Sequence, residues 1–213
     1  MGVRDNTSGT CGENLMWLYD ISSKTLTING TGRMDDYAFV SNQPWYSFSQ
    51  SIEHVYVDDG VSSLGEFSFS SVNNLISVRI PSSITSIGSN AFTYCYKLSS
   101  VTIPEGVRTI GPDAFSHCES LKTITIPSSV IEIDSSPFES CYGLTSIIVN
   151  SSNPYYATEG DALVDKGITS IIIPSSVTWI GSHALDSCKN LTSVVIRSNL
   201  TSIGSYASMD VQV

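Results

Sequence analysis

Charged residues are scarce in this 213-residue sequence, and positive charge is scarcer still. Asp, Glu, Lys and Arg make up 14% of the chain, against about 25% in typical soluble domains. There are 20 acidic and 10 basic side chains, so the net charge is −10. A surface this negative repels phosphate groups, so we expect no nucleic-acid partner and no binding to anionic membrane surfaces.

Long hydrophobic runs are also missing. Runs such as Ile171–Ile173 fall far short of the roughly 20 residues that a membrane-spanning helix needs, so we expect no membrane insertion. Residues 1–5 lack the apolar stretch of a secretory signal, and the sequence by itself names no compartment. The hydrophobic fraction of 41% argues against intrinsic disorder. The chain is also long enough to form a hydrophobic core without disulfides or metals.

The chain repeats itself with a period of 23 residues. Five kinds of residue recur at this spacing, and a fixed period of this length is typical of stacked repeat architectures. The recurring positions are Pro81, Pro104 and Pro127; Phe69, Phe92, Phe115 and Phe138; Gly65, Gly88 and Gly111; Cys95, Cys118 and Cys141; and Leu75, Leu98, Leu121 and Leu144.

One unit, residues 98–121, illustrates the pattern. Apolar and polar side chains alternate up to residue 103, which predicts a strand with one inward face, and Pro104 ends it because proline cannot donate to a ladder. A second short extended stretch follows at residues 107–110. Apolar residues at spacings of three and four in residues 114–121 then predict about one turn of helix or 3-10 helix.

Such a unit cannot bury its apolar side alone, so neighbouring units must stack into one continuous core. We therefore predict an α/β repeat solenoid with units of about 23 residues. It has a parallel β-sheet on one face and short strands with short helices or 3-10 turns on the other.

Two domains are expected. Residues 1–50 do not fit the period; they contain a predicted strand at Thr25–Ile28 and several aromatic residues, and we interpret them as an N-terminal capping region. Residues 51–213 carry about seven repeats.

The repeat pattern breaks in two places. Residues 150–166 form an irregular unit, with a predicted turn at Asn153-Pro154 and a hairpin across Glu159-Gly160-Asp161. The C-terminal repeat is incomplete and no cap follows it, which indicates either self-association through an uncapped end or a chain cut from a longer one.

The repeated unit has the form Ile-Pro-Ser-Ser-Val-Thr-x-Ile-Gly-x-x-Ala-Phe-x-x-Cys-x-x-Leu-x-x-Val-x-Ile-Pro, carried by residues 52–208. It resembles the BspA-like class of leucine-rich repeats, and the segment from Ser8 to Gly32 resembles the N-terminal region of that family. The resemblance implies a leucine-rich-repeat solenoid at the cell surface or secreted, which binds matrix proteins such as fibronectin or fibrinogen. It supplies no catalytic motif.

The cysteines invite a disulfide or zinc hypothesis. No Cys-x-x-Cys spacing exists, so we expect no zinc site and no other cofactor. Adjacent repeats could bring Cys95, Cys118 and Cys141 near disulfide distance, but their fixed place three residues before an inward leucine favours a buried ladder of thiols. Cys11 lies outside this register, and its state stays open.

Catalytic and calcium-binding arrangements are not indicated. His54 lies at an outward strand position, whereas His117 and His183 fall in the variable turn segments, so no nucleophile–histidine pair is predicted and we expect no enzyme. Asp58-Asp59-Gly60 does not follow the alternating carboxylates of a calcium loop and is interpreted as a solvated turn.

The outward strand positions are the candidate ligand-binding surface. Toward the N-terminus they carry polar and aromatic side chains, and toward the C-terminus three apolar side chains on adjacent repeats. The alternatives for the apolar set are simple β-propensity or cover by the hairpin of residues 150–166. The candidate residues are His54, Tyr56, Arg79, Ile148, Ile172 and Val195.

These observations predict a non-enzymatic module that binds protein ligands. The favoured hypothesis, which depends on the family resemblance, is a surface adhesin for host matrix proteins or cells. The alternative is a cytoplasmic scaffold that mediates protein–protein interactions.

Overall fold

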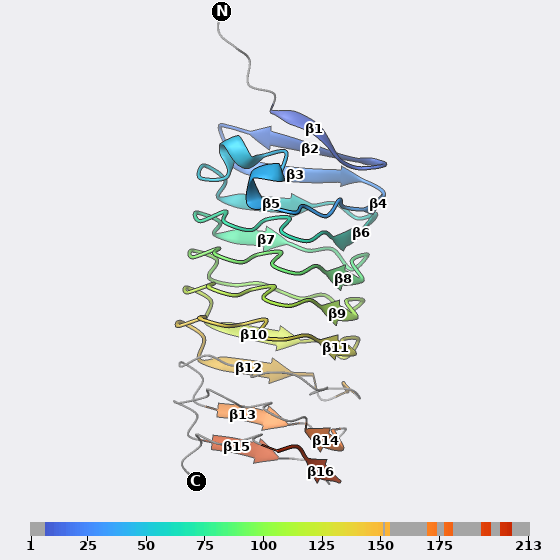
Figure 1. Cartoon of the computed structure of the whole chain (residues 1–213), viewed down its shortest axis with the longest axis vertical. Helices are drawn as coiled ribbons and strands as arrows, with labels where there is room; N and C mark the ends of the chain where they lie inside the picture. The colour runs from blue at the N-terminus through green and yellow to red at the C-terminus, as the bar shows by residue number, and fades with distance from the viewer. Residues whose placement is uncertain are drawn as a thin grey trace, which may run out of the picture.

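The computed structural model describes residues 7–150, 152–153, 170–173, 177–180, 193–196 and 201–205. The chain winds as a stack of similar turns along its long axis, with short strands lying above one another (Figure 1). The predicted repeat solenoid is confirmed, with parallel sheets and very little helix.

One face of the solenoid carries the longer strands, which run parallel with a register offset of about one repeat. Tyr56 pairs with Arg79 and Ile124 with Ile147. The repeat between β7 and β10 contributes a single bridge, from Ser77 to Ser100. The strands are β5 (His54–Val57), β7 (Ser77–Arg79), β10 (Thr123–Ile126), β12 (Ser146–Val149), β13 (Ser170–Ile173) and β15 (Ser193–Ile196).

A second set of short parallel strands lies on another side of each turn, where the sequence predicts the second extended stretch. Pairs such as Ile87 with Ile110 hold it together. The strands are β4 (Gly32–Arg33), β6 (Val61–Leu64), β8 (Ser86–Ile87), β9 (Thr109–Ile110), β11 (Glu132–Ile133), β14 (Trp179–Ile180) and β16 (Ser202–Ile203).

The phenylalanine column forms a continuous stack through the core. Ring centroids of Phe69, Phe92, Phe115 and Phe138 are 5.4, 5.2 and 5.8 Å apart in succession, and all four rings are fully buried. Trp45, which precedes the regular repeats, stacks on Phe69 at 5.5 Å and so continues the column at its N-terminal end. Stacked rings add to the stabilisation that apolar burial already gives.

The cysteine column is buried, as predicted. The thiols of Cys95, Cys118 and Cys141 donate to the carbonyl oxygens of Phe69, Phe92 and Phe115, respectively, at 3.3, 3.3 and 3.1 Å. Cys95 and Cys118 are not in disulfides. The small, weakly polar thiol therefore fills the core and satisfies one carbonyl of the preceding repeat.

The turn segments differ from the prediction of short helices or 3-10 turns, since neither is found in the described repeats. In the described repeats they are successive tight turns, illustrated by residues 113–118. Ser116 N–H donates within its own turn to Asp113 at 3.0 Å, whereas His117 N–H donates to Glu139 of the next repeat at 2.7 Å. Alternate N–H groups thus donate to the next repeat, whereas in a helix the N–H groups donate to carbonyl oxygens of the same helix.

The 3-10 helices in the described residues are η1 (Val40–Asn42) and η2 (Tyr46–Phe48), ahead of the first regular turn segment. They lie beside an antiparallel meander of β1 (Ser8–Gly12), β2 (Leu15–Asp20) and β3 (Thr25–Gly30), and β3 pairs in parallel with β5. The predicted strand at Thr25–Ile28 is therefore β3, where antiparallel pairing gives way to parallel pairing.

Gln43 ties this N-terminal region to the first repeat. Its buried side-chain Nε2 donates to the carbonyl oxygens of Phe67 and Ser70, at 2.5 and 3.0 Å. We propose that residues 1–50 act as the cap, because this amide takes the place of the N–H groups that a preceding repeat would offer.

The irregular unit begins with a buried asparagine. Asn153 N–H donates to the Asn150 carbonyl at 2.9 Å, so a turn forms here as predicted. Its side-chain Nδ2 donates to the carbonyl oxygens of Pro127 and Val130 in the preceding repeat, at 2.8 and 2.9 Å. The predicted hairpin across residues 159–161 lies outside the described residues, as do His183 and Cys188.

Candidate binding surface

The alternation of each strand determines which side chains reach solvent. In β5 the side chains of Val55 and Val57 are buried, so His54 and Tyr56 point outward. We call the outward positions of the first set of strands the strand face. It contains five of the six candidate residues from the sequence, namely His54, Tyr56, Arg79, Ile148 and Val195, and the backbone of the sixth, Ile172, is paired with Val195.

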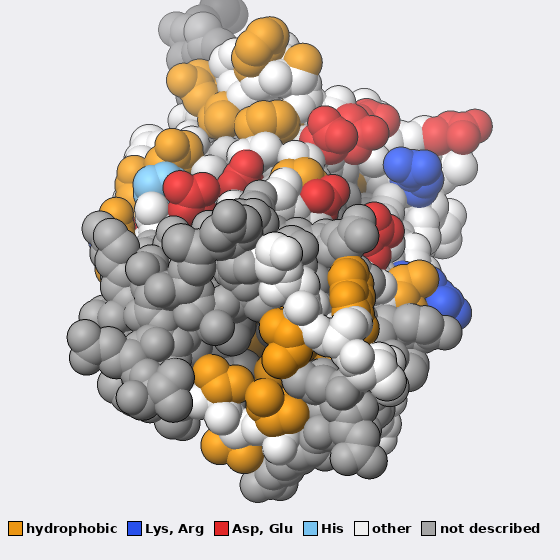
Figure 2. Space-filling view, turned by 60° about the horizontal axis from the view of Figure 1, so that its bottom comes forward, with side chains coloured by type: hydrophobic (Ala, Val, Ile, Leu, Met, Phe, Trp, Pro, Cys, Tyr) orange, Lys and Arg blue, Asp and Glu red, His pale blue; other side chains and the backbone are white. Residues whose placement is uncertain are grey.

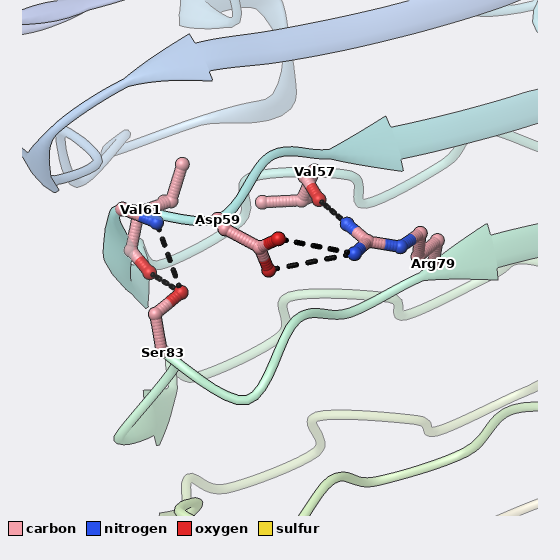
Figure 3. Close-up of polar contacts among 6 residues, drawn as sticks. Val57, Asp59, Val61, Arg79 and Ser83 are labelled. Atoms are coloured by element: carbon pink, nitrogen blue, oxygen red, sulfur yellow. Dashed lines mark hydrogen bonds and ion pairs between the residues drawn. The ribbon is translucent and has the colours of Figure 1, made fainter.

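Arg79 is the best-anchored side chain of the strand face. Its guanidinium carbon lies 4.7 Å from the centre of the Tyr56 ring, in cation–π geometry. Nη1 donates to the Val57 carbonyl oxygen at 2.8 Å, and Nη2 lies 3.4 Å from both carboxylate oxygens of Asp59 (Figure 3). Arg79 therefore carries an oriented positive charge beside an exposed aromatic ring.

The turn that carries Asp59 is held by the next repeat. Ser83 Oγ donates to the Val61 carbonyl at 2.7 Å and accepts from Gly60 N–H at 3.3 Å. Gly60 has φ of +108°, a left-handed conformation that favours glycine. The sequence indicated a solvated turn here but gave no sign that Asp59 pairs with Arg79, since the two meet only when repeats stack.

His54 joins the same group of polar residues. Its Nδ1 lies 2.9 Å from Ser77 Oγ, and the two residues pair in register between β5 and β7. His54, Tyr56 and Arg79 therefore lie on the adjacent strands β5 and β7.

The apolar candidates lie further along the solenoid, on β12, β13 and β15. Ile148 is 49% exposed although its strand neighbours Ile147 and Val149 are buried, and Val195 is 42% exposed. Ile172 pairs in register with Val195, and its side chain lies outside the described residues. β7 and β12 belong to different sheets, so the polar candidates and the apolar candidates form distinct parts of the strand face.

Figure 2 turns the C-terminal end of the solenoid toward the viewer, and hydrophobic side chains are visible there among the described atoms. The exposed hydrophobic residues of the last described strands include Ile148, Val195, Ile196 and Ile203. Acidic side chains gather elsewhere on the same view. Apolar side chains are therefore exposed at this end, as they are earlier in the chain at Leu18, Phe39 and Ile76.

The thiols of Cys11 and Cys95 are not activated as nucleophiles. Burial raises the pKa of the Cys11 thiol to about 12, with a contribution from the Asp35 carboxylate. Burial likewise raises the pKa of the Cys95 thiol. Since the thiolate is the nucleophile, these thiols are unreactive at neutral pH. No cluster of three or more His, Cys, Asp or Glu in this part of the chain is arranged to hold a metal.

A family model decides the identity of this architecture. The model of the BspA type leucine-rich repeat region matches in six copies, over residues 39–160 and 159–209. The chain belongs to the BspA-type leucine-rich repeat family. None of the helices among its described residues has the length and apolar character that a membrane crossing requires. No protein with a curated description matches the sequence.

Solved structures of leucine-rich repeat proteins are similar to this BspA-type chain. One from Eubacterium ventriosum has 28% identity and a TM-score of 0.62, covering 93% of this chain and 62% of that one. A leucine rich cell surface protein from Faecalibacterium prausnitzii has 26% identity and a TM-score of 0.62, covering 92% and 55%. One from Bacteroides ovatus, at 20% identity and a TM-score of 0.66, covers 95% and 57% and shows the fold alone. This chain spans less than two thirds of each.

Proposed function

We propose that this BspA-type chain is the non-enzymatic binding module of a cell-surface adhesin, and that its strand face recognises host extracellular matrix proteins or cell surfaces. The observation that carries the proposal is the exposure of Ile148 and Val195 at outward positions of a parallel sheet, where most side chains are polar. Exposed apolar residues mark interaction surfaces, and β13, which carries Ile172, lies between the strands of these two residues. Stacked repeats extend such a surface over several strands.

The polar part of the strand face suits the same role. Arg and Tyr are the side chains most often found at binding hot spots, and Arg79 and Tyr56 already contact each other. The Arg79 guanidinium is oriented by Val57 and Asp59, so little rotamer entropy is lost when a partner binds it. Surface location is supported by the similarity to the Faecalibacterium prausnitzii cell surface protein.

The test is binding to immobilised fibronectin, fibrinogen and laminin. We expect saturable binding by the wild-type chain and its loss in the triple variant Ile148→Asp, Ile172→Asp, Val195→Asp. The matched control adds the same charge at three exposed serines outside these strands, Ser41→Asp, Ser47→Asp and Ser82→Asp, and should bind like wild type. Both triple variants must first show the wild-type melting profile.

Each outcome decides a separate part of the proposal. Binding that survives the strand-face variant would move the site to another surface of an adhesin. Absence of binding to all three matrix proteins would contradict the adhesin and favour the second candidate.

The second candidate is an intracellular scaffold. The observation that favours it is the pair of thiols Cys95 and Cys118, which lie in adjacent repeats and form no disulfide. Uncrosslinked thiols are usual in reducing compartments. Protease treatment of intact cells separates the two candidates, because only a surface-exposed chain would be cleaved.

A further inference from the structure

Aromatic rings gather on the turn segments of three adjacent repeats, outside the strand face. The rings of Tyr94 and His117, in adjacent repeats, stack with centroids 4.5 Å apart and planes 23° apart. Tyr96 flanks Tyr94 at 5.9 Å, tilted by 56°. Both tyrosines are exposed and His117 is half-buried. Such rings on a polar, acidic surface are poorly solvated and available for stacking.

The stack follows one column of the repeat and stops at Ser140. Ser71, Tyr94, His117 and Ser140 occupy this column, and their φ angles are all left-handed, at 60°, 63°, 57° and 54°. Equal backbone geometry directs the four side chains alike, so a ring at position 140 would continue the stack. A serine there supplies no ring to cover the His117 face on its side.

The space above Ser140 is bounded by a further tyrosine. Tyr142 is exposed, and its hydroxyl donates to Ser140 Oγ at 3.4 Å. It stands two residues after Ser140, as Tyr96 stands two residues after Tyr94. A planar group over Ser140 would therefore meet the face of His117 and the side of Tyr142, repeating the contacts that Tyr94 makes.

Two carboxylates lie close to His117. Glu139 is exposed, and Asp113 is half-buried. Burial and the Glu139 charge raise the pKa of Asp113, whereas His117 lowers it, so these groups share one electrostatic environment. The charges of Asp113 and Glu139 favour a positively charged ligand here.

We propose that the space bounded by His117, Ser140, Tyr142 and Glu139 binds an arginine side chain of a protein partner. A guanidinium is flat, so it can continue the ring stack, and it is cationic, so it can pair with Glu139. A lysine ammonium has the charge without the plane. The chain already uses this chemistry once, where Arg79 lies over Tyr56.

The other end of the column lacks these features. Ser71 is next to Tyr94 in this column, on the side away from His117. Its carbonyl oxygen accepts from Gln50 Nε2 at 3.1 Å. The side-chain amide of Asn73 donates to the carbonyl oxygens of Tyr94 and Ser71 at 3.0 and 3.1 Å. The repeat position of Tyr142 is therefore held by Asn73 at this end, and that of Glu139 by Ser70, so neither the ring nor the charge is present. Ser71 is therefore a matched control position.

The experiment measures fluorescence anisotropy of a labelled hexapeptide that carries two arginines among glycines and serines. Lysine and citrulline versions keep the charge or the plane alone and should bind more weakly. Ser140→His fills the space with the residue that His117 already carries at the same φ, and should reduce affinity for the arginine peptide about tenfold. His117→Ser and Glu139→Gln should each reduce it severalfold.

Ser71→His adds the same ring at the control end and should leave the affinity unchanged. The proposal is overturned if Ser140→His binds the peptide like wild type while melting normally, if both Ser→His variants lose binding equally, or if the lysine peptide binds as tightly as the arginine one. The strand-face triple variant should bind the peptide normally, so failure of the adhesin proposal and failure of this one are distinguishable.

Discussion

The side-chain amide of Gln43 donates to the carbonyl oxygen of Ser70 at 3.0 Å. In each described repeat that follows, the equivalent carbonyl accepts a backbone N–H from the repeat before it, as Thr93 accepts from Ser71 at 2.8 Å. Gln43 thus gives the first turn segment the hydrogen-bond donor that each later turn segment receives from the repeat before it. Tyr37 N–H does the same for the Glu66 carbonyl at 3.1 Å.

Replacing Gln43 should destabilise the N-terminal end. Gln43→Met keeps the shape but leaves two carbonyl oxygens without this donor, and we expect a loss of about 1–3 kcal/mol in the free energy of unfolding, measured in urea. Gln50→Met is the matched control. Gln50 also donates to a carbonyl of the same segment but is exposed, so its loss should cost well under 1 kcal/mol. Equal costs for both variants would contradict a capping role for Gln43.

Acid should weaken one link between repeats. Glu105 accepts from the backbone N–H groups of Ser128 and Ser129 at 3.1 and 3.2 Å, and these hydrogen bonds, that of Ser128 first, lower its pKa. A lowered pKa in the folded state means that the stabilisation is present above the ordinary carboxyl range and lost as pH falls through the folded-state pKa.

The variant Glu105→Gln should therefore be less stable than wild type at neutral pH, and this difference should shrink as pH falls. Melting temperatures of wild type and variant are compared between about pH 7 and pH 3. We expect the two curves to differ at neutral pH and to converge at the acid end. Glu13→Gln, at an exposed position with no such hydrogen bond described, should show no convergence of this kind. A constant difference across the range would show that the Glu105 charge is not the cause.

The thiols should react only after unfolding. Cys11, Cys95 and Cys118 are fully buried, and burial raises the pKa of each. In a Cys188→Ser background we expect modification by a thiol reagent at neutral pH to be slow and to follow the unfolding rate as urea rises. Rapid native-state labelling of any of these three, located by mass spectrometry, would contradict the buried ladder.

Much of the fold could be predicted from the period alone. Stacking at 23 residues requires that Phe92 meet Phe115 and that Tyr56 lie beside Arg79, and both relationships are found. The turn segments could not be predicted, because apolar spacings of three and four suit a helix as well as a chain of tight turns. The positive φ angles of residues such as Asp113 and His117 distinguish the two, and the residue type gives only a weak indication of such an angle.

The sequence did not reveal why glycine recurs at positions such as Gly88. A Cβ on Gly88 would lie 2.7 Å from the backbone nitrogen of Glu66 in the preceding repeat, so glycine is required by close backbone stacking. The ion pair of Arg79 with Asp59 was hidden for a related reason. It joins residues of successive repeats, and single-sequence patterns describe only what happens within one unit.

The last described turn exposes side chains whose partners in the preceding turn are buried. Ile196 is 46% exposed, whereas Ile173, its partner in register, is 2% exposed. Ile203 is 57% exposed, whereas its partner Ile180 is 3% exposed. Inward-facing residues left uncovered favour association, so we predict that this chain forms dimers through this end at micromolar concentrations. Light scattering across a dilution series should show a mass that rises with concentration. Ile203→Asp should keep the chain monomeric, and Ile131→Asp, at an exposed isoleucine in the middle of the solenoid, should not. A monomeric wild type, or equal association by both variants, would contradict this interface.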